Sequence, residues 1–283
     1  MITILKSGLQ SSFQDKGRHH FRHQGVPLSG AMDSYAMELA NHLVANAENS
    51  PVLEFTLLGP DLHFEKSCYI ALTGAHFSPA LNGKTIPMRT RVYVEPNSTL
   101  KIGNAREGMY GYLAIQGGFE LEEVLGSCSY YPSVAPHLKI EKGQQINYDS
   151  SNQKASNFSR VAPVSNHFDG NLLEVNKGPE FSSLSKTHRE KLLSTKYTIG
   201  QSSNRMSIQL EHNESLAATE IITSPVQPGT IQLTPSGKLM ALMRDAQTTG
   251  GYARVLQLTP ESIQRLAQKK IGSEVMFELS GKR

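Results

Sequence analysis

The sequence predicts a mainly β protein of two lobes with a few short helices. Most of the chain consists of short β-rich runs that end at Gly, Pro or Asn, and only three segments have helical periodicity. A stretch poor in apolar residues separates the two halves. A chain of 283 residues is long enough for one large or two medium domains.

Four runs are typical of the predicted strands: 69–74, 91–94, 112–115 and 231–234. Each contains β-branched or aromatic residues, which suit a pleated and partly buried backbone. Strands at this spacing, with few helices between them, favour antiparallel sandwiches or barrels over a doubly wound parallel sheet.

Three helices are predicted. The first begins after Asp33, whose carboxylate is a suitable N-cap, and its apolar residues recur at helical spacing as far as Ala47. The second begins at Thr259, with Pro260 at the first helical position. The third, at 187–193, has a weaker pattern.

Residues 149–168 are rich in Ser and Asn and poor in apolar side chains, which is typical of a connector between domains. We therefore expect an N-terminal lobe at 1–150, a linker at 151–168 and a C-terminal lobe at 169–283.

Composition excludes several classes of protein. The 28 Lys and Arg against 25 Asp and Glu give a formal charge of +3, too small a surplus for a phosphate-binding face unless it is concentrated. The N-terminus turns polar before a secretory segment could form, and no stretch approaches about 18 uninterrupted apolar residues. We expect a soluble, cytoplasmic protein that binds neither nucleic acid nor membrane. Cys68 and Cys128 are expected to be reduced thiols.

A first polar segment runs from Gln14 to Asp33 and ends at the predicted helix N-terminus. Its glycines permit close backbone approach, and helix N-termini favour anions. The side chains able to hold a polar ligand are Gln14, Asp15, Arg18, Ser29 and Asp33. On composition alone the segment is more typical of a polar loop that caps a helix, and that interpretation is preferred because polar Gly-rich loops are common at caps.

The helix after Asp33 carries Asn41 and Asn46, which lie about 140° apart around its axis at 3.6 residues per turn. They need not share a face. In the structural alternative, Asn46 lies near the C-cap and Asn41 is solvated.

A second polar segment follows the apolar run 239–243. It presents Asp245, Gln247, Thr248, Thr249, Gly250, Gly251 and Tyr252. A hairpin turn at the glycines is the alternative, but a turn needs no such set of polar side chains, so we favour a site.

Other patterns predict less. His19, His20 and His23 lack an accompanying ligand set, so no metal site is expected. Cys128 is interpreted as a packed thiol. Neither GxxxxGK[ST] nor GxGxxG occurs, so any nucleotide would be held in another way.

Several motifs taken together resemble one family. In chain order they are Gln14-Asp15-x-Gly17-Arg18, Gly25-Val26-Pro27-x-Ser29-Gly30-Ala31-Met32-Asp33, Ala40-Asn41-x-Leu43-Val44-x-Asn46, Gln116-Gly117-Gly118, Gly126-Ser127 and Asp245-x-Gln247-Thr248-Thr249-Gly250-Gly251-Tyr252. The set resembles the family formed by the C subunit of 5-oxoprolinase, also labelled allophanate hydrolase subunit 2. It is similar as well to the carboxyltransferase domain of urea carboxylase.

The resemblance implies a two-lobed, mainly β architecture of cyclophilin-like barrels. It implies partners homologous to the A and B subunits of 5-oxoprolinase and a small amide substrate, with ATP, and Mg beside it, as cofactor. In the family's reaction ATP phosphorylates the lactam carbonyl of 5-oxoproline, and water then releases glutamate. The urea carboxylase relative moves a carboxyl group from carboxybiotin to an amide nitrogen, so biotin is expected only under that alternative.

Both chemistries require the protein to hold an N–C=O group. Side-chain amides can pair with both edges of such a group, Arg can bind a carboxylate or phosphate bidentately, and Asp can transfer protons or contact a metal–phosphate complex. The predicted catalytic residues are Asp15, Asp33 and Asp245. The predicted substrate-binding residues are Gln14, Arg18, Asn41, Asn46, Arg205, Gln232, Gln247, Thr248, Thr249 and Tyr252.

Three functions follow from this interpretation. The first is one component of an ATP-dependent 5-oxoprolinase, an amidohydrolase acting on a cyclic amide. The second is a biotin-dependent carboxyltransferase component acting on urea or another amide. The third is a non-catalytic regulatory partner of the B-type homologue.

Overall fold

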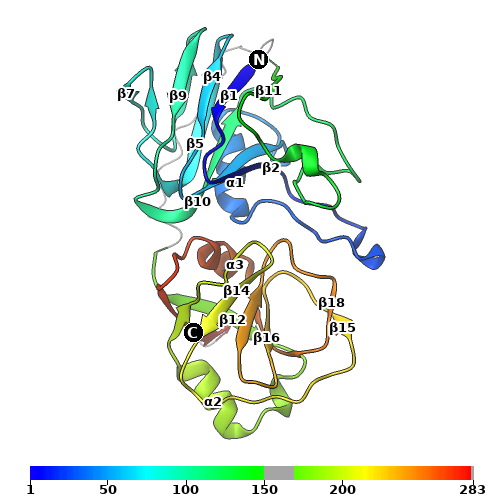
Figure 1. The fold of residues 1–283 in the computed structure, drawn as a ribbon. Coiled ribbons are helices and arrows are strands. Elements are labelled where there is room, and N and C mark those ends of the chain that lie inside the picture. The colour runs from blue at the N-terminus through cyan, green and yellow to red at the C-terminus, as the bar shows by residue number, and fades with distance from the viewer. Residues whose placement is uncertain (150–168, 282–283) are drawn as a thin grey trace. The chain divides into compact units, whose positions relative to one another are not determined.

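The computed structural model describes residues 1–149 and 169–281 (Figure 1). Within these ranges, residues 1–18 and 29–149 form a first compact unit, and residues 19–28 and 169–281 form a second. The segment 19–28 therefore belongs to the second unit, although in the sequence it lies inside the predicted N-terminal lobe. The predicted linker at 151–168 lies outside the described residues.

The first unit contains two antiparallel sheets. One has the order β11 (Gln145–Ile146), β1 (Ile2–Lys6), β4 (Asp61–Phe64), β9 (Ser98–Lys101), β6 (Ala80–Leu81) and β7 (Lys84–Thr85). The other has the order β2 (Gln10–Gln14), β3 (Val52–Thr56), β10 (Glu107–Ile115), β5 (Cys68–His76) and β8 (Arg91–Val94).

The second of these sheets is buried on both faces. Because side chains alternate along a strand, Leu53 and Phe55 of β3 enter the apolar core shared by the two sheets, whereas Glu54 points to the opposite face. Helix α1 (Ser34–Leu43) packs on β10, β5 and β3. Thr73 of β5 donates to the Ala36 carbonyl of that helix at 2.6 Å. This opposite face therefore positions the N-terminus of α1.

The second unit is a closed seven-stranded barrel. Its strands in order are β12 (Leu172–Lys177), β19 (Ala253–Leu258), β16 (Thr230–Leu233), β17 (Leu239–Leu242), β14 (Ser207–Glu211), β13 (Tyr197–Ile199) and β20 (Glu274–Leu279). The pair β12–β20 is parallel, and the other neighbouring pairs are antiparallel.

A separate two-stranded ribbon accompanies the barrel and is called here the β15–β18 ribbon. It consists of β15 (Ser224–Pro225) and β18 (Thr249–Gly250). Two backbone hydrogen bonds extend the pairing, from Ile221 N to the Gly251 carbonyl at 3.0 Å and from Val226 N to the Thr248 carbonyl at 3.1 Å. The glycines of this segment thus belong to a ribbon and do not form the tight hairpin that was the alternative.

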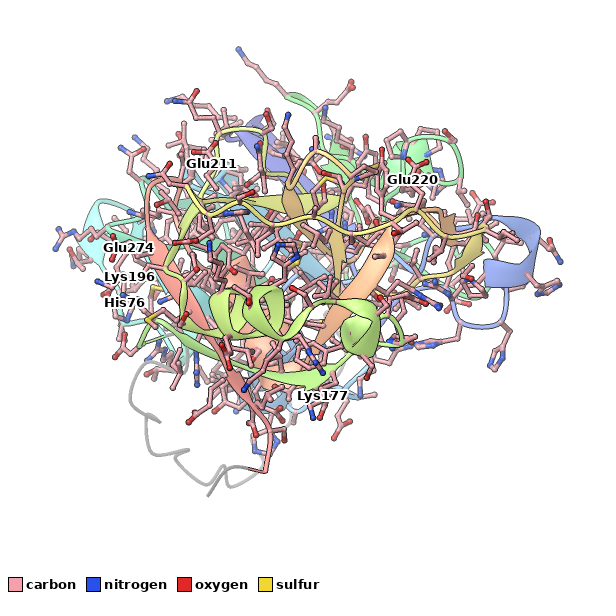
Figure 2. The ribbon with its side chains drawn as sticks, turned by 90° about the horizontal axis from the view of Figure 1, so that it is seen from below. His76, Lys177, Lys196, Glu211, Glu220 and Glu274 are labelled. Atoms are coloured by element: carbon pink, nitrogen blue, oxygen red, sulfur yellow. The ribbon has the colours of Figure 1, made fainter. Side chains whose placement is uncertain are left out.

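The unit also contains helices α2 (Lys186–Ser194) and α3 (Pro260–Ala267) and the short 3-10 helices η1 (Arg22–Gln24) and η3 (Phe181–Ser183). In the first unit, η2 spans Pro136–Leu138. An ion pair at the surface of the barrel unit joins Lys196 to Glu274 across 3.5 Å (Figure 2).

The mainly β class with barrel architecture is confirmed, and so are the helix starts. Asp33 and Thr259 are the N-caps of α1 and α3, each accepting a backbone hydrogen bond from three residues ahead. Helix α1 ends at Leu43, earlier than the apolar pattern reaching Ala47 suggests, because the chain turns there. In residues 1–149 and 169–281, no helix has the length and apolar character needed to span a membrane.

Candidate functional site

The predicted site residues fall into two sets, one in each unit. The first unit holds Gln14, Asp15, Arg18, Asp33, Asn41 and Asn46. The second unit holds Arg205, Gln232, Asp245, Gln247, Thr248, Thr249 and Tyr252.

Asp15 is buried and its carboxylate accepts four hydrogen bonds. Oδ1 accepts from Gly17 N at 2.8 Å, Ser127 Oγ at 2.7 Å and Ser129 Oγ at 2.6 Å, and Oδ2 accepts from Cys128 N at 2.7 Å. These contacts tie the loop around residue 128 to the end of β2. All four of these hydrogen bonds hold backbone or hydroxyl groups of the protein, and the predicted catalytic role of Asp15 stays a prediction.

Arg18 donates hydrogen bonds to the same loop around residue 128. Its Nε donates to the Val124 carbonyl at 3.1 Å and its Nη2 donates to the Ser129 carbonyl. Gln14 donates from Nε2 to Ser12 Oγ at 3.0 Å, and its buried Oε1 has no hydrogen-bond partner.

Asp33 holds the start of α1. Its Oδ1 accepts from Ala36 N at 3.1 Å, and its own N–H donates to the Tyr112 hydroxyl at 2.8 Å. That hydroxyl donates to Glu54 Oε2 at 2.9 Å, and Met32 N donates to the same oxygen at 2.8 Å. Burial, with the nearby carboxylates of Glu54 and Asp33, raises the pKa of Tyr112 well above its usual value. The phenol is thus a neutral structural link.

Glu54 was not predicted as a functional residue. Glu54 could have been found because it is the one carboxylate in the otherwise mostly apolar strand 52–56. A buried acid is nearly always paired with a partner, so an acid at such a position indicates a specific polar contact.

Asn41 and Asn46 stabilise the turn after α1. Asn41 Nδ2 donates to the Ser50 carbonyl at 2.7 Å, and Asn46 Nδ2 donates to the Ile115 carbonyl at 2.7 Å and to Asn41 Oδ1 at 3.3 Å. Asn46 Oδ1 accepts from Gly117 N at 2.9 Å. Asn41 is buried, in contrast to the solvated alternative, because the chain folds back over it.

In the barrel unit, Gln232 has the most unusual environment. Ile231 and Leu233 of the same strand pack inward, so Gln232 projects from the outer face, between Met240 of β17 and Arg254 of β19. It is fully buried, and neither Nε2 nor Oε1 has a hydrogen-bond partner. The Gln232 amide can donate through Nε2 and accept through Oε1, and in this structure it makes neither hydrogen bond.

Gly250 of the β15–β18 ribbon covers this amide. A Cβ at position 250 would lie 2.7 Å from Gln232 Nε2 and 3.6 Å from Gln247 Nε2, so the two predicted amide side chains approach the same glycine. Because no side chain fits there, Gly250 lets the ribbon lie directly on the Gln232 amide.

Arg254, opposite Gln232, is paired with Glu180. Arg254 Nε donates to Glu180 Oε2 at 3.0 Å and Nη2 donates to Oε1 at 2.8 Å, while Nη1 donates to the Pro225 carbonyl of the ribbon at 3.0 Å. Hydrogen bonding to Arg254 lowers the pKa of Glu180, and the same contact raises the pKa of Arg254. Neither residue was among the predicted site residues, because their pairing spans 74 positions of sequence.

Arg205 and Asp245 form a second buried bidentate pair. Nε donates to Oδ2 at 2.8 Å and Nη2 donates to Oδ1 at 3.1 Å, and Asp245 N donates to the Arg205 carbonyl at 2.9 Å. Both carboxylate oxygens are thus engaged. The pair fixes the chain that leads into Gln247 and the ribbon.

The remaining predicted residues lie along the ribbon. Thr248 is half-buried and contributes its carbonyl to the Val226 hydrogen bond, whereas Thr249 is exposed. The Tyr252 ring is 37% exposed just after β18.

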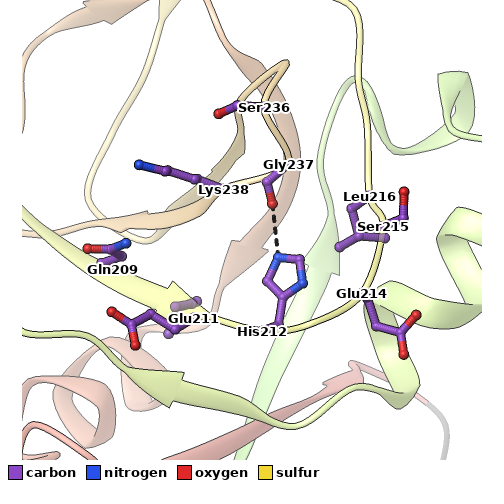
Figure 3. Close-up of a pocket in the computed structure, with 10 residues that line it drawn as sticks. Gln209, Glu211, His212, Glu214, Ser215, Leu216, Ser236, Gly237 and Lys238 are labelled. Atoms are coloured by element: carbon purple, nitrogen blue, oxygen red, sulfur yellow. Dashed lines mark hydrogen bonds between the residues drawn. The ribbon is translucent and has the colours of Figure 1, made fainter.

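Two cavities open elsewhere on the barrel unit. One of about 340 Å³ includes His212, whose Nε2 contacts the Gly237 carbonyl at 2.9 Å (Figure 3). The other, of about 450 Å³, is bounded by Glu180 and residues 217–221. No predicted site residue lines either cavity.

The two ion pairs described above are balanced in charge. Each guanidinium group, of Arg205 and of Arg254, is neutralised by one carboxylate. The group left without partners is a neutral amide. An amide with both edges unpartnered suits a ligand group that offers one N–H and one C=O.

The sequence model of the family described as carboxyltransferase domain, subdomain A and B, matches residues 24–279. The chain belongs to this family. Two relatives, from Escherichia coli (strain K12) and Haemophilus influenzae, are each 30% identical to it, and both are named as the C subunit of 5-oxoprolinase. The alignments cover 98% of this chain and 90% and 91% of those proteins. By name, these relatives are parts of an enzyme.

The crystal structure of the Kluyveromyces lactis urea carboxylase contains a similar fold. The TM-score is 0.88 at 25% identity, over 98% of this chain. The matched part is 27% of the length of that chain, so the family domain there is one part of a longer protein. The resemblance drawn from the sequence motifs is thereby confirmed.

Proposed function

We propose that this chain is the C subunit of an ATP-dependent 5-oxoprolinase and that Gln232 recognises the lactam of the substrate. In the overall reaction, water is added across the lactam C–N bond of 5-oxoproline to give glutamate, and ATP is hydrolysed to ADP and phosphate. The observation that carries the proposal is the buried Gln232 amide with both edges unpartnered. Similarity over 98% of the chain to a protein named for 5-oxoprolinase supports this choice of lactam.

The role of Gln232 follows from its chemistry. Nε2–H can donate to the lactam carbonyl and Oε1 can accept from the lactam N–H. A donor fixed in a water-excluded site stabilises negative charge that develops on the carbonyl oxygen, which is the requirement for attack at the carbonyl carbon. Because Gly250 covers the amide, we propose that the β15–β18 ribbon opens to admit the substrate.

In this proposal the ion pairs Arg205–Asp245 and Arg254–Glu180 position the β15–β18 ribbon and do not contact the reacting atoms. Both oxygens of Asp245 are occupied by Arg205, so we propose that Asp245 fixes the ribbon entrance and does not exchange protons with the substrate. Arg254 orients the ribbon by its hydrogen bond to the Pro225 carbonyl.

The two paired arginines, Arg205 and Arg254, do not fit a nucleotide polyphosphate. Arg205 and Arg254 are each neutralised by a carboxylate, which would repel phosphate oxygens. We propose that ATP, with Mg, serves the assembled enzyme and is held away from this face.

The proposal is tested by combining the purified chain with its A and B partners, 5-oxoproline, ATP and Mg. Glutamate and ADP are expected to form in equal amounts, and to do so only when this chain is present. Partners that are active with a known C subunit but give no glutamate with this chain would contradict the proposal.

A second function is supported by the carboxyltransferase-domain family and by the urea carboxylase fold. In it, the chain transfers a carboxyl group from carboxybiotin to an amide nitrogen. The ureido ring of biotin also offers N–H and C=O groups, so Gln232 fits this group as well. Avidin separates the two functions, since it blocks a biotin-dependent transfer and leaves the 5-oxoproline reaction unaffected.

A further inference from the structure

The segment 19–28 brings one arginine to the β15–β18 ribbon. Arg22 lies in η1, and its Nη2 donates to the carbonyl of Val226, the residue after β15. The side chain is half-buried, and burial lowers the pKa of its guanidinium group. This part of the chain is locally basic in sequence, and the proposed function does not use it.

Arg22 differs from Arg205 and Arg254. Arg205 and Arg254 are each paired with a carboxylate, whereas Arg22 makes no ion pair within the described ranges 1–149 and 169–281. A guanidinium group has five N–H donors, and the only acceptor that Arg22 contacts there is the Val226 carbonyl. A half-buried cation therefore retains its charge and most of its donors.

The ribbon connects this cation to the Gln232 site. The carbonyls of the consecutive residues Pro225 and Val226 accept from Arg254 and Arg22 respectively. Arg254 lies opposite Gln232 in the barrel. Strand β18, whose Gly250 covers the amide, pairs with β15, which contains Pro225 and ends just before Val226. The two guanidinium groups thus hold adjacent peptide units of the ribbon that covers Gln232.

We propose that Arg22 binds the carboxylate of the substrate while Gln232 binds its lactam, an inference that rests on the proposed function. 5-Oxoproline carries both groups on one small ring. The Gln232 amide and the Arg22 guanidinium match them in kind, and a planar fork of N–H donors binds a carboxylate bidentately. Arg22 is then the residue that selects a lactam acid over a neutral lactam.

The test compares two ligands in the enzyme assembled with its A and B partners. 5-Oxoproline is the substrate, and 2-pyrrolidinone, the same ring without the carboxylate, is added as the competing ligand and is expected to inhibit competitively. The variants are Arg22→Gln, which keeps a donor for the Val226 carbonyl but loses the charge, and Arg22→Lys, which keeps the charge. His23→Gln, an exposed change in the same short helix, is the matched control.

For Arg22→Gln we expect kcat/KM for 5-oxoproline to fall roughly 10- to 100-fold, with partial recovery in Arg22→Lys. The inhibition constant of 2-pyrrolidinone should stay unchanged, and so should both quantities in the His23 control. Equal losses for both ligands would make Arg22 a structural support of the ribbon and would overturn the inference, as would unchanged kcat/KM. Absence of turnover by the unmodified chain would instead overturn the proposed function on which the inference rests.

Discussion

The buried side chain of Gln232 lowers the stability of the free protein. A buried polar group left without a hydrogen bond destabilises a protein by about 1–3 kcal/mol, against a total stability of roughly 5–15 kcal/mol for a typical domain. In this structure both ends of the Gln232 amide are in that state. A ligand that supplies one acceptor and one donor removes the cost, which is why this residue is central to the proposed site.

We expect Gln232→Met to raise the free energy of unfolding by about 1–3 kcal/mol, because methionine has a similar shape and no unsatisfied amide. Urea unfolding of the purified chain measures the difference. Gln209→Met is the matched control, since Gln209 lies on the same outer face of the barrel and is only half-buried. A less stable Gln232→Met protein would mean that the amide is satisfied in the free protein.

At the scale of elements, the polar loops before α1 are explained by folding. The segment 31–33 is held by three buried acceptors: the Asp15 carbonyl, the Glu54 carboxylate and the Tyr112 hydroxyl. The carboxylate of Asp33 then caps α1.

Capping makes a specific prediction for Asp33. Asp33→Ala should lower the free energy of unfolding by about 1 kcal/mol, whereas Asp33→Asn should change it by only a few tenths, because Asn is as good an N-cap as Asp. Thermal or urea unfolding of the two variants measures this. If both variants lost the same stability, the negative charge would be the important feature and the capping account would be wrong.

The elements were predictable because their signals are local. The caps Asp33 and Thr259 and the β-rich runs lie within a few residues of the structures that they specify. The polar segment at 245–252 is predicted to be a site because its side chains exceed what a turn requires, and its role in binding stays a prediction. The ion pair between Glu180 and Arg254 was not predictable from the sequence, because the two residues come into contact only through the strand register of the barrel.

The position of the segment 19–28 in the fold was also not predictable from local sequence. Its basic residues are visible in the sequence, but its membership in the barrel unit depends on a fold in which the chain leaves the first unit and returns to it. Nothing in the local pattern predicts that Arg22 contacts a carbonyl 204 positions away.

At the scale of the whole molecule, the first unit leaves one edge of the buried Gln14 amide unpartnered, whereas the barrel unit leaves both edges of the Gln232 amide unpartnered. We therefore propose that the barrel unit recognises the substrate. The reaction itself is proposed to need the A and B partners, because two relatives at 30% identity are named as one subunit of 5-oxoprolinase.

The most direct measurement is kcat/KM for 5-oxoproline in the enzyme assembled with the Gln232→Met chain and its A and B partners. We predict a fall of roughly 100- to 1000-fold relative to the unmodified chain, the size expected when a donor to the reacting carbonyl is removed. The same protein should be folded and at least as stable as the original. An unchanged kcat/KM in a folded Gln232→Met enzyme would contradict the claim that this amide holds the substrate.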